Sequence, residues 1–375
     1  MPWATETLGK VLRKYRNTAP LAEKLATVPY VGKGGEWLDS GRSGNGWWTN
    51  GFWPAIMWQC YALTKDEFYM GEARRAQEKI LKEMHGYYNT SHDLGFMYLL
   101  SCGADYKLTG DKDALRETLM AANLLAGRFN PGGNFIRSWN QPGREGWVIV
   151  DCMMNLPLLY SATNLTNDPR YDAVARQHAD TTNANIVRED GSCFHIVTFD
   201  PYTGCKLSTP AGQGSHEGSS WSRGQAWALY GFTLSYLHTR DPKYLYTARR
   251  IADYFMSQIR PDGLTRVDFQ QPDSVDMVDN LAAAIAACGL IELSRETGND
   301  IYRESAVRLL KALDELCANY DENTCGVLQR CTAAYSASYS RPELERETNI
   351  IYGDYFYIEA LAKLTQQDPM LWVVG

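Results

Sequence analysis

The chain has 375 residues, of which 45% are hydrophobic and 22% are charged, and this globular composition excludes a disordered or collagen-like polypeptide. A formal net charge of −7 argues against a nucleic acid or an anionic membrane as partner, although a local basic group can still bind an acidic small molecule. The sequence has no uncharged apolar run long enough to span a bilayer, so we expect no transmembrane helix.

The N-terminal residues lack the basic-then-apolar pattern of a signal peptide, which leads us to expect a cytoplasmic protein. None of the nine cysteines forms a Cys-x-x-Cys pair, so neither a disulfide framework nor a structural zinc site is favoured. The chain also has no phosphate-binding loop, dinucleotide fingerprint or His-Glu-x-x-His motif. We therefore expect no cofactor and no metal.

A short motif, in which a threonine is followed closely by an aspartate, recurs along the whole chain. The first copy is Leu63-Thr64-Lys65-Asp66, and the aspartates of the six copies stand at positions 66, 111, 168, 241, 300 and 368. Threonine and aspartate are residues that cap helices, and in three copies a proline follows the aspartate at the first position of the next helix. Each motif thus predicts a tight turn between two helices.

The segments on the two sides of each motif differ in polarity. The segment before it is apolar, as in 51–63, which has no charged residue, whereas the segment after it is amphipathic, as in 68–85. A helix that is apolar all round is buried, and one with a charged stripe faces water. The sequence therefore predicts inner helices near 51–63, 95–107, 151–163, 224–238, 280–296 and 354–364, and outer helices near 3–16, 68–85, 112–128, 169–184, 242–258 and 301–318.

Six inner and six outer helices that close on each other predict an all-α fold, an (α/α)6 barrel, as a single domain over residues 1–375. Strand signals are few. The exception is 192–208, where two apolar runs flank the turn residues 200–204 and predict a small β-hairpin.

The loops that precede the inner helices are longer than the turns that follow them, and they meet at the opposite mouth of the predicted barrel. They contain several carboxylates, histidines, an arginine and many tryptophans. Long loops on a rigid scaffold commonly form sites, and paired carboxylates among aromatic rings are typical of enzymes that act on glycosidic bonds.

Asp151 is the strongest catalytic candidate among these carboxylates. It stands between Trp147–Val150 and Cys152–Met154, and such apolar surroundings favour the protonated form of a carboxyl that has to donate a proton. Asp93 is the second candidate, since it follows His92 in a polar loop. Asp279 and Asp354 stand at helix starts, where helix capping explains them better than catalysis.

Other loop residues leave two interpretations open. Arg223 can pair with a capping aspartate or bind an anionic ligand. His195, taken alone, is more typical of a structural residue than of a catalytic one. Trp48, Trp139 and Trp221 lie at loop ends and are better placed for stacking on sugar rings than the other tryptophans.

The chain resembles the unsaturated glucuronyl hydrolases of glycoside hydrolase family 88 over essentially its whole length. The segments that carry this resemblance are WTNGFWP (48–54), SHDLGF (91–96), DCMMNLPLL (151–159), the His195 hairpin, GSSWSRGQAWALYGF (218–232) and GDYFYIEAL (353–361). The resemblance implies an (α/α)6 barrel, in agreement with the repeat.

The resemblance also implies a substrate and a mechanism. The substrates would be oligosaccharides left by polysaccharide lyases, with a 4,5-unsaturated uronic acid at the non-reducing end. Asp151 would protonate C4 and activate the water that adds at C5, while Asp93 would bind ring hydroxyls and keep Asp151 protonated by charge repulsion. The pocket residues implied by position are Trp48, His92, Trp139, His195, Gln213, Trp221, Arg223 and Trp227.

One segment departs from the family pattern. Members that act on sulfated glycosaminoglycan fragments carry a Ser-x-x-Ser-x-Lys element ahead of the final GDYFY. Here Ser336 and Arg341 fit the outer positions, and Tyr339 replaces the second serine. Arg341 would still be able to bind a sulfate.

Three other functions stay open at this point. The first is that of an unsaturated rhamnogalacturonyl hydrolase, which uses the same enol-ether chemistry with rhamnose at the leaving position. The second is that of a sugar epimerase on the same barrel, for which His92 and His195 would face one ring. The third is a sugar-binding toroid without catalysis. The sequence leaves the oligomeric state open.

Overall fold

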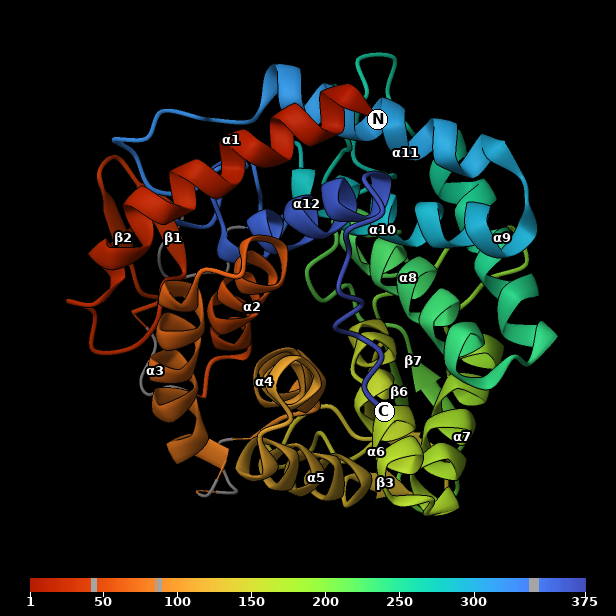
Figure 1. The fold of residues 1–375 in the computed structure, drawn as a ribbon. Coiled ribbons are helices and arrows are strands. Elements are labelled where there is room, and N and C mark those ends of the chain that lie inside the picture. Colours follow the sequence, from red (N-terminus) through yellow and green to blue (C-terminus); the bar gives the residue numbers. More distant parts are fainter. Residues whose placement is uncertain (42–45, 85, 87–89, 337–343) are drawn as a thin grey trace.

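The structure is a computed structural model that describes residues 1–41, 46–84, 86, 90–336 and 344–375. Two concentric rings of helices form an (α/α)6 barrel (Figure 1), which confirms the predicted fold. The outer ring consists of α1 (Pro2–Thr18), α3 (Glu67–Met84), α5 (Lys112–Ala126), α7 (Pro169–Asn185), α9 (Pro242–Ser257) and α11 (Asp300–Leu316). The inner ring consists of α2 (Phe52–Thr64), the π-helix η3 (Gly95–Gly103) with α4 (Ala104–Thr109), the 3-10 helix η4 (Val150–Met154) with α6 (Leu156–Thr166), α8 (Ser222–Thr239), α10 (Asn280–Thr297) and α12 (Ile351–Leu364).

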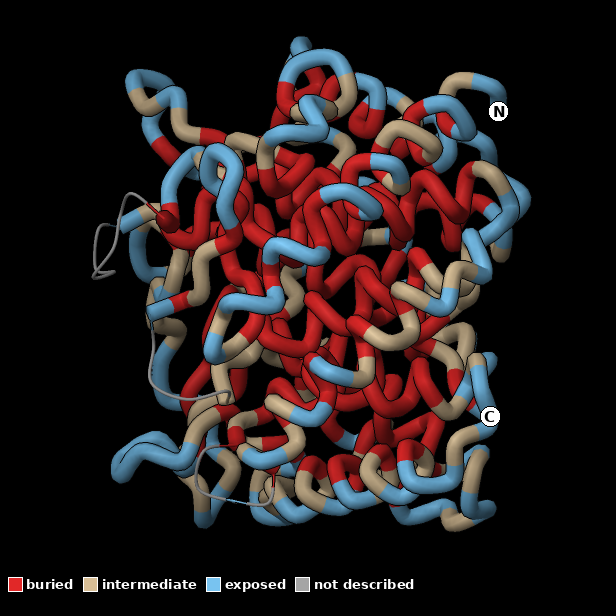
Figure 2. The backbone as a smooth tube through the Cα atoms, turned by 60° about the vertical axis from the view of Figure 1, so that its left-hand side comes forward, coloured by how far each residue is buried: buried red, intermediate tan, exposed pale blue. Residues whose placement is uncertain are grey.

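Burial explains why the two rings differ in sequence. Every residue of α10 from Asn280 to Ser294 is buried, whereas α11 buries only one stripe of side chains. Figure 2 shows the same contrast for the whole molecule, with a buried interior and an exposed periphery. Among the described residues, no helix combines the length and the apolar character needed to cross a membrane.

The recurring threonine–aspartate motif forms the turn from an inner to an outer helix. In the first copy, Lys65 has a left-handed backbone with φ 61°, the Asp66 N–H donates to Thr64 Oγ1 at 3.2 Å, and Asp66 Oδ1 accepts the Phe68 N–H at 3.0 Å. The same three features recur around Asp111, Asp168, Asp241 and Asn299. The fifth cap is Asn299 rather than the predicted Asp300, because it is Asn299 that directly follows the left-handed residue.

The predicted hairpin is present, and a third strand extends it. Strands β6 (Ile196–Phe199) and β7 (Lys206–Ser208) pair antiparallel, and β5 (Trp147–Ile149) pairs with the other side of β6. Two further hairpins were not predicted, namely β1 (Val31–Lys33) with β2 (Glu36–Leu38) and β3 (Phe129–Asn130) with β4 (Phe135–Ile136). Strands of two or three residues are too short to show an alternating pattern. Two short 3-10 helices, η1 (Ala19–Ala22) and η2 (Trp48–Gly51), complete the fold.

The C-terminal segment lies across the mouth of the barrel where the inner helices end. In Figure 1 this segment runs from α12 toward α6. Lys107 Nζ donates to the Met370 and Val373 carbonyls, His238 Nε2 donates to the Trp372 carbonyl at 3.0 Å, and the Val374 N–H donates to Ser161 Oγ at 3.2 Å. The C-terminal segment therefore covers this mouth, and the loops at the other mouth remain for a site.

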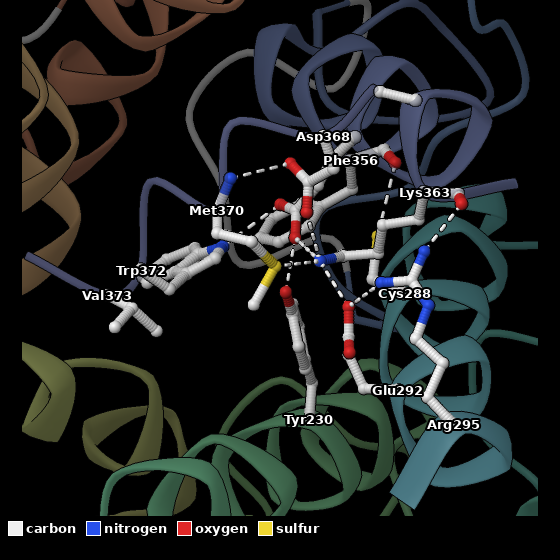
Figure 3. A network of polar contacts seen from close by, with 12 residues as sticks. Tyr230, Cys288, Glu292, Arg295, Phe356, Lys363, Asp368, Met370, Trp372 and Val373 are labelled. Carbon is white, nitrogen blue, oxygen red and sulfur yellow. Dashed lines mark hydrogen bonds and ion pairs between the residues drawn. The ribbon is translucent and has the colours of Figure 1, made fainter. Parts of the chain in front are cut away.

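A buried ionic network holds the segment in place (Figure 3). The fully buried Lys363 ammonium contacts Asp368 and lies 2.7 Å from Glu292 and 3.3 Å from Glu359. Burial raises the pKa of Glu359 to about 7, and the Lys363 charge opposes that shift. Burial disfavours the Lys363 ammonium, but the three carboxylates outweigh it and raise the pKa of Lys363.

We predict that Lys363→Met destabilises the protein, because the methionine fills the space but leaves three buried carboxylates without their cation. Removing one partner of a buried ion pair typically costs about 3–5 kcal/mol. Denaturant unfolding followed by circular dichroism measures the loss. The control is Lys311→Met on the exposed face of α11, which should change the free energy of unfolding by less than about 0.5 kcal/mol. Equal stability of the two variants would contradict the structural role of the network.

Candidate active site

A cavity of about 370 Å³ opens at the mouth where the inner helices begin. Its walls come from the loops before five inner helices and from the β5 region. It is lined by Tyr30, Gly46, Trp47, Trp48, Ser91, His92, Asp93, Trp139, Arg144, Ile149, Asp151, Gln213, Ala333 and Tyr352. Both predicted catalytic carboxylates thus share one cavity with five tryptophan and tyrosine side chains from several segments of the chain.

Asn155 ties together the two chain segments that carry these carboxylates. Its Oδ1 accepts the Phe96 N–H at 2.8 Å, at the start of the π-helix that follows Asp93, and its Nδ2 donates to the Asp151 carbonyl at 3.3 Å. A Cβ atom on Gly95 would lie 2.6 Å from the Asn155 Cα, so the close approach of the two segments requires glycine there. A π-helix costs backbone regularity and is frequent at functional sites.

Asp93 is buried, with 7% of its surface exposed, and its carboxylate oxygens face two polar neighbours. Ser91 Oγ donates to Oδ2 at 2.5 Å, and His92 Nε2 lies 3.3 Å from Oδ1. Burial raises the pKa of Asp93, and the nearby charge of Asp151 adds to this, whereas His92 and the Ser91 hydrogen bond oppose it. A negative charge on Asp151 thus favours the protonated form of Asp93.

The tautomer of His92 follows from its other ring nitrogen. Nδ1 lies 3.1 Å from the Ser138 carbonyl, so it carries a hydrogen and donates. In a neutral ring Nε2 then has no hydrogen, and two acceptors would face each other at Nε2 and Asp93 Oδ1. A proton on either group would remove this repulsion.

The second carboxylate has an imidazole neighbour of the opposite tautomer. His195 Nδ1 accepts the Gln213 N–H at 2.9 Å, which leaves the hydrogen on Nε2, and this Nε2 lies 3.5 Å from Asp151 Oδ2. Within the described part of the chain, Asp151 Oδ2 and the Nε2 atoms of His92 and His195 are buried without a hydrogen bond. Buried polar atoms are nearly always satisfied, so this cluster has the features of a site that a substrate or water completes.

The structure brings together most of the residues selected from the sequence. Trp48, His92, Trp139 and Gln213 line the cavity beside the two aspartates. His195 is 4% exposed and does not line the cavity itself, but its Nε2 lies 3.5 Å from Asp151 Oδ2.

Arg223, Trp221 and Trp227 also lie outside the wall of the cavity. Arg223 is fully buried, pairs with Asp279 at 2.5 Å and donates to the Thr332 and Ala333 carbonyls, as the capping-aspartate interpretation expects. Its binding of an anionic ligand stays a prediction. Asp279 itself caps α10 by accepting the Leu281 N–H.

The other two are tryptophans of the α8 region. Trp227 is fully buried and packs on Phe96 and Phe356, which makes it a core residue. Trp221 is 1% exposed and supports the His195 ring, with 4.3 Å between the ring centroids. Both sit one layer behind the cavity because α8 is an inner helix that is buried on all sides.

The segment predicted to bind sulfate is only partly described. Ser336 is exposed and is not among the residues that line the cavity, and Arg341 lies outside the described residues. Asp354 is not an N-cap, since it lies inside α12, where its carboxylate accepts the Val327 and Leu328 N–H groups and the Tyr15 hydroxyl.

Eight lining residues were not selected from the sequence, and four of them have aromatic or charged side chains: Tyr30, Trp47, Arg144 and Tyr352. Trp47 and Tyr352 directly precede the motifs WTNGFWP and GDYFYIEAL, whereas no motif surrounds Tyr30 or Arg144. Among the described residues, no three histidine, cysteine or acidic side chains gather in a way that could hold a metal ion.

Comparison with known proteins agrees with this geometry. The sequence profile of Glycosyl Hydrolase Family 88 matches residues 31–361, which is most of the chain. The chain belongs to this family. It is therefore a glycoside hydrolase by family membership, with the barrel mouth as the position of its carboxylate pair.

Relatives in the family have been characterised from several bacteria. The chain is 34% identical to the unsaturated glucuronyl hydrolase of Bacillus sp. strain GL1 over 87% of this chain and 88% of that one. It is 33% identical to the unsaturated chondroitin disaccharide hydrolase of Streptococcus pneumoniae over 87% of this chain and 83% of that one. The crystal structure of the Bacillus enzyme superposes with a TM-score of 0.90 at 32% identity and covers 99% of both chains.

We predict that Asn155→Ala loosens the link between the two carboxylate segments. The variant leaves the buried Phe96 N–H without an acceptor, which typically costs about 1–3 kcal/mol. Denaturant unfolding measures this loss. Asn164→Ala, at an exposed position of α6, serves as the matched control and should unfold like the unchanged protein. The idea fails if both alanine variants unfold at the same denaturant concentration.

Proposed function

We propose that this protein removes 4,5-unsaturated uronic acid from the non-reducing end of oligosaccharides produced by polysaccharide lyases. The reaction is hydration of the C4=C5 enol ether. The observation that carries the proposal is the pairing of Asp151 with Asp93 in one cavity, where Asp151 Oδ2 is buried without a hydrogen bond in the described part of the chain. The similarity to unsaturated glucuronyl hydrolases supports it.

In the proposed mechanism Asp151 acts first as an acid and then as a base. Its carboxyl proton adds to C4, and the resulting positive charge is shared between C5 and the ring oxygen. The Asp151 carboxylate then takes a proton from the water whose oxygen adds to C5. The hemiketal formed at C5 opens, and the neighbouring sugar leaves from C1 as an alcohol.

The two histidines support different charge states of the two carboxylates. The Nε2–H of His195 points toward Asp151 and stabilises the carboxylate that forms after proton donation. On the other side, the mechanism requires Asp93 to be ionised, and His92, whose Nε2 lies 3.3 Å from Asp93 Oδ1, opposes the upward shift of the Asp93 pKa. An ionised Asp93 accepts hydrogen bonds from ring hydroxyls and keeps the proton on Asp151 by repulsion.

The aromatic walls supply binding energy for the sugar rings. Trp48 and Trp139 are half-buried in the cavity wall, so each can offer a ring face to a sugar. His92 and Gln213 add polar contacts at the same wall. We propose that one barrel domain over residues 1–375 carries the activity. A cytoplasmic location stays a prediction.

The arrangement disfavours a sugar epimerase with paired histidine bases. Each imidazole faces a carboxylate, His92 at Asp93 and His195 at Asp151, rather than a common point between two free bases. A panel of unsaturated disaccharides from glycosaminoglycan and rhamnogalacturonan lyases separates the proposed function from that of an unsaturated rhamnogalacturonyl hydrolase, because the two differ in the leaving sugar.

The decisive prediction concerns Asp151→Asn, which removes the acid but keeps the shape of the side chain. Turnover should fall by at least ~10²–10⁴-fold, the usual contribution of a general acid–base group. The loss of ultraviolet absorbance of the unsaturated uronate on incubation with lyase products measures turnover. Asp113→Asn on the exposed end of α5 is the control and should remain fully active, since the Asp113 side chain is 80% exposed. Unchanged turnover in Asp151→Asn would refute the assigned role.

A second prediction concerns the pH dependence. The Ser91 hydroxyl stabilises the ionised form of Asp93, so Ser91→Ala should raise the pKa of Asp93 further. Because the proposed mechanism needs Asp93 ionised, activity is lost as the pH falls through this pKa. The acid side of the kcat/KM profile should therefore move to higher pH in the variant, while the alkaline side stays in place. A profile that moves to lower pH would contradict the role of Asp93.

A further inference from the structure

The charge of the cavity poses a problem for the proposed substrate. An unsaturated uronate carries a carboxylate, and the cavity already contains Asp93 and Asp151. Arg223, the expected partner for an anion, is buried and paired with Asp279. Among the described residues that line the cavity, Arg144 is the one with a permanent positive charge.

Two tryptophans hold Arg144 in position. Its guanidinium carbon lies 5.3 Å from the ring centroid of Trp139 and 4.8 Å from that of Trp147, and the two rings are themselves in contact at 6.0 Å. Stacking of a guanidinium on aromatic faces restricts the side chain but leaves its N–H edges available. Arg144 is thus arranged in advance for a ligand.

The donors of Arg144 are available to a ligand. The residue is exposed, and within the described ranges its side chain takes part in no hydrogen bond or ion pair, in contrast to Arg128 and Arg137 nearby, whose Nε atoms donate to the Arg137 and Trp139 carbonyls. A planar guanidinium with free N–H groups matches the geometry of a carboxylate or a sulfate.

The position of Arg144 is on the open side of the cavity. Asp151 is 7% exposed and lies at the buried end, whereas Arg144 is exposed and contacts Trp139 in the wall. A substrate bound in the cavity between Asp151 and Trp139 would therefore lie next to Arg144.

We propose that Arg144 is a specificity-determining residue that binds an oxyanion of the substrate at the open side of the cavity. This inference rests on the proposed function. Two groups supply the same chemistry: a sulfate ester on the leaving sugar and the carboxylate of the unsaturated uronate. The first makes Arg144 selective for sulfated substrates, and the second makes it necessary for every substrate.

The test compares Arg144→Gln and Arg144→Lys with the unchanged protein on the unsulfated, 4-sulfated and 6-sulfated unsaturated chondroitin disaccharides. Glutamine keeps much of the side-chain length and removes the charge. We expect Arg144→Gln to lower kcat/KM by about 10-fold or more, as for the loss of a charge-assisted hydrogen bond, mainly through KM. Arg144→Lys should retain part of the affinity, since it keeps the charge but loses the planar fork.

The pattern of the loss identifies the anion. A loss confined to one or both sulfated substrates supports the sulfate ester, and an equal loss on all three supports the uronate carboxylate. The control is Arg170→Gln, which removes an arginine stacked on Tyr171 in α7, away from the cavity, and should leave all three substrates unaffected.

Two outcomes would overturn the proposal. One is a kcat/KM for Arg144→Gln that stays within about twofold of the unchanged protein on all substrates, well below the effect of a charge-assisted hydrogen bond. The other is an equal loss in Arg144→Gln and Arg144→Lys that appears in kcat alone, which would assign Arg144 a structural role in placing Trp139. Binding of the same disaccharides to Asp151→Asn, followed by tryptophan fluorescence, repeats the comparison without turnover, so a failure of the proposed reaction is distinguished from a failure of this inference.

Discussion

The carboxylates of Asp93 and Asp151 are both buried at one mouth of a barrel of apolar helices, and the arrangement of the site depends on this burial. An isolated buried carboxylate is strongly disfavoured in its charged form. The fold manages this by placing an imidazole beside each one, with the ring orientation fixed by a backbone group: the Ser138 carbonyl for His92 and the Gln213 N–H for His195. Nδ1 therefore carries a hydrogen in His92 and none in His195, so the two carboxyls have imidazole neighbours that are fixed in different ways.

At the opposite mouth of the barrel, the buried charges are all paired with one another. There Lys363 is surrounded by three carboxylates, and Glu359 also accepts hydrogen bonds from Tyr230 and from Trp372 Nε1 (Figure 3). The polar atoms of this network have partners within the protein, which is the condition under which buried charges are tolerated. At the active-site mouth, Asp151 Oδ2 and His195 Nε2 lack a hydrogen bond in the described part of the chain. The Lys363 network is therefore satisfied within the protein and has a structural role. The atoms of Asp151 and His195 are not satisfied in this way, as expected for a site that binds a ligand.

The sequence predicted the parts of the fold that are determined by local chemistry. The Thr64–Asp66 turn and its repeats depend only on hydroxyl and carboxylate contacts within a few residues, so their spacing located every inner and outer helix to within a few positions. The alternation of apolar and amphipathic segments depends on burial alone, and it predicted the two rings. Asp93 and Asp151 were found because each is a carboxylate near the start of a predicted helix. The residues next to them in the sequence are informative as well, since Asp151 has apolar neighbours and Asp93 lies in a polar loop.

The residues that sequence reasoning placed wrongly or missed depend on contacts across long stretches of chain. Arg223 meets Asp279, 56 positions away, and the Ala333 carbonyl, 110 positions away, and no local pattern indicates either contact. Arg144 stands in a turn between short strands, and only the approach of Trp139 and Trp147 in space gives it a role.

Arg223 nevertheless acts on the cavity through its partners. Ala333 lines the cavity, and its carbonyl accepts hydrogen bonds from both Arg223 and Gln213 Nε2, the latter at 2.6 Å. Gln213 in turn fixes the tautomer of His195 through its backbone N–H. A buried cation thus holds a carbonyl, the carbonyl holds the Gln213 side chain, and the Gln213 N–H determines which nitrogen of His195 faces Asp151. Arg223 can therefore influence the cavity through these contacts while its own charge is paired with Asp279.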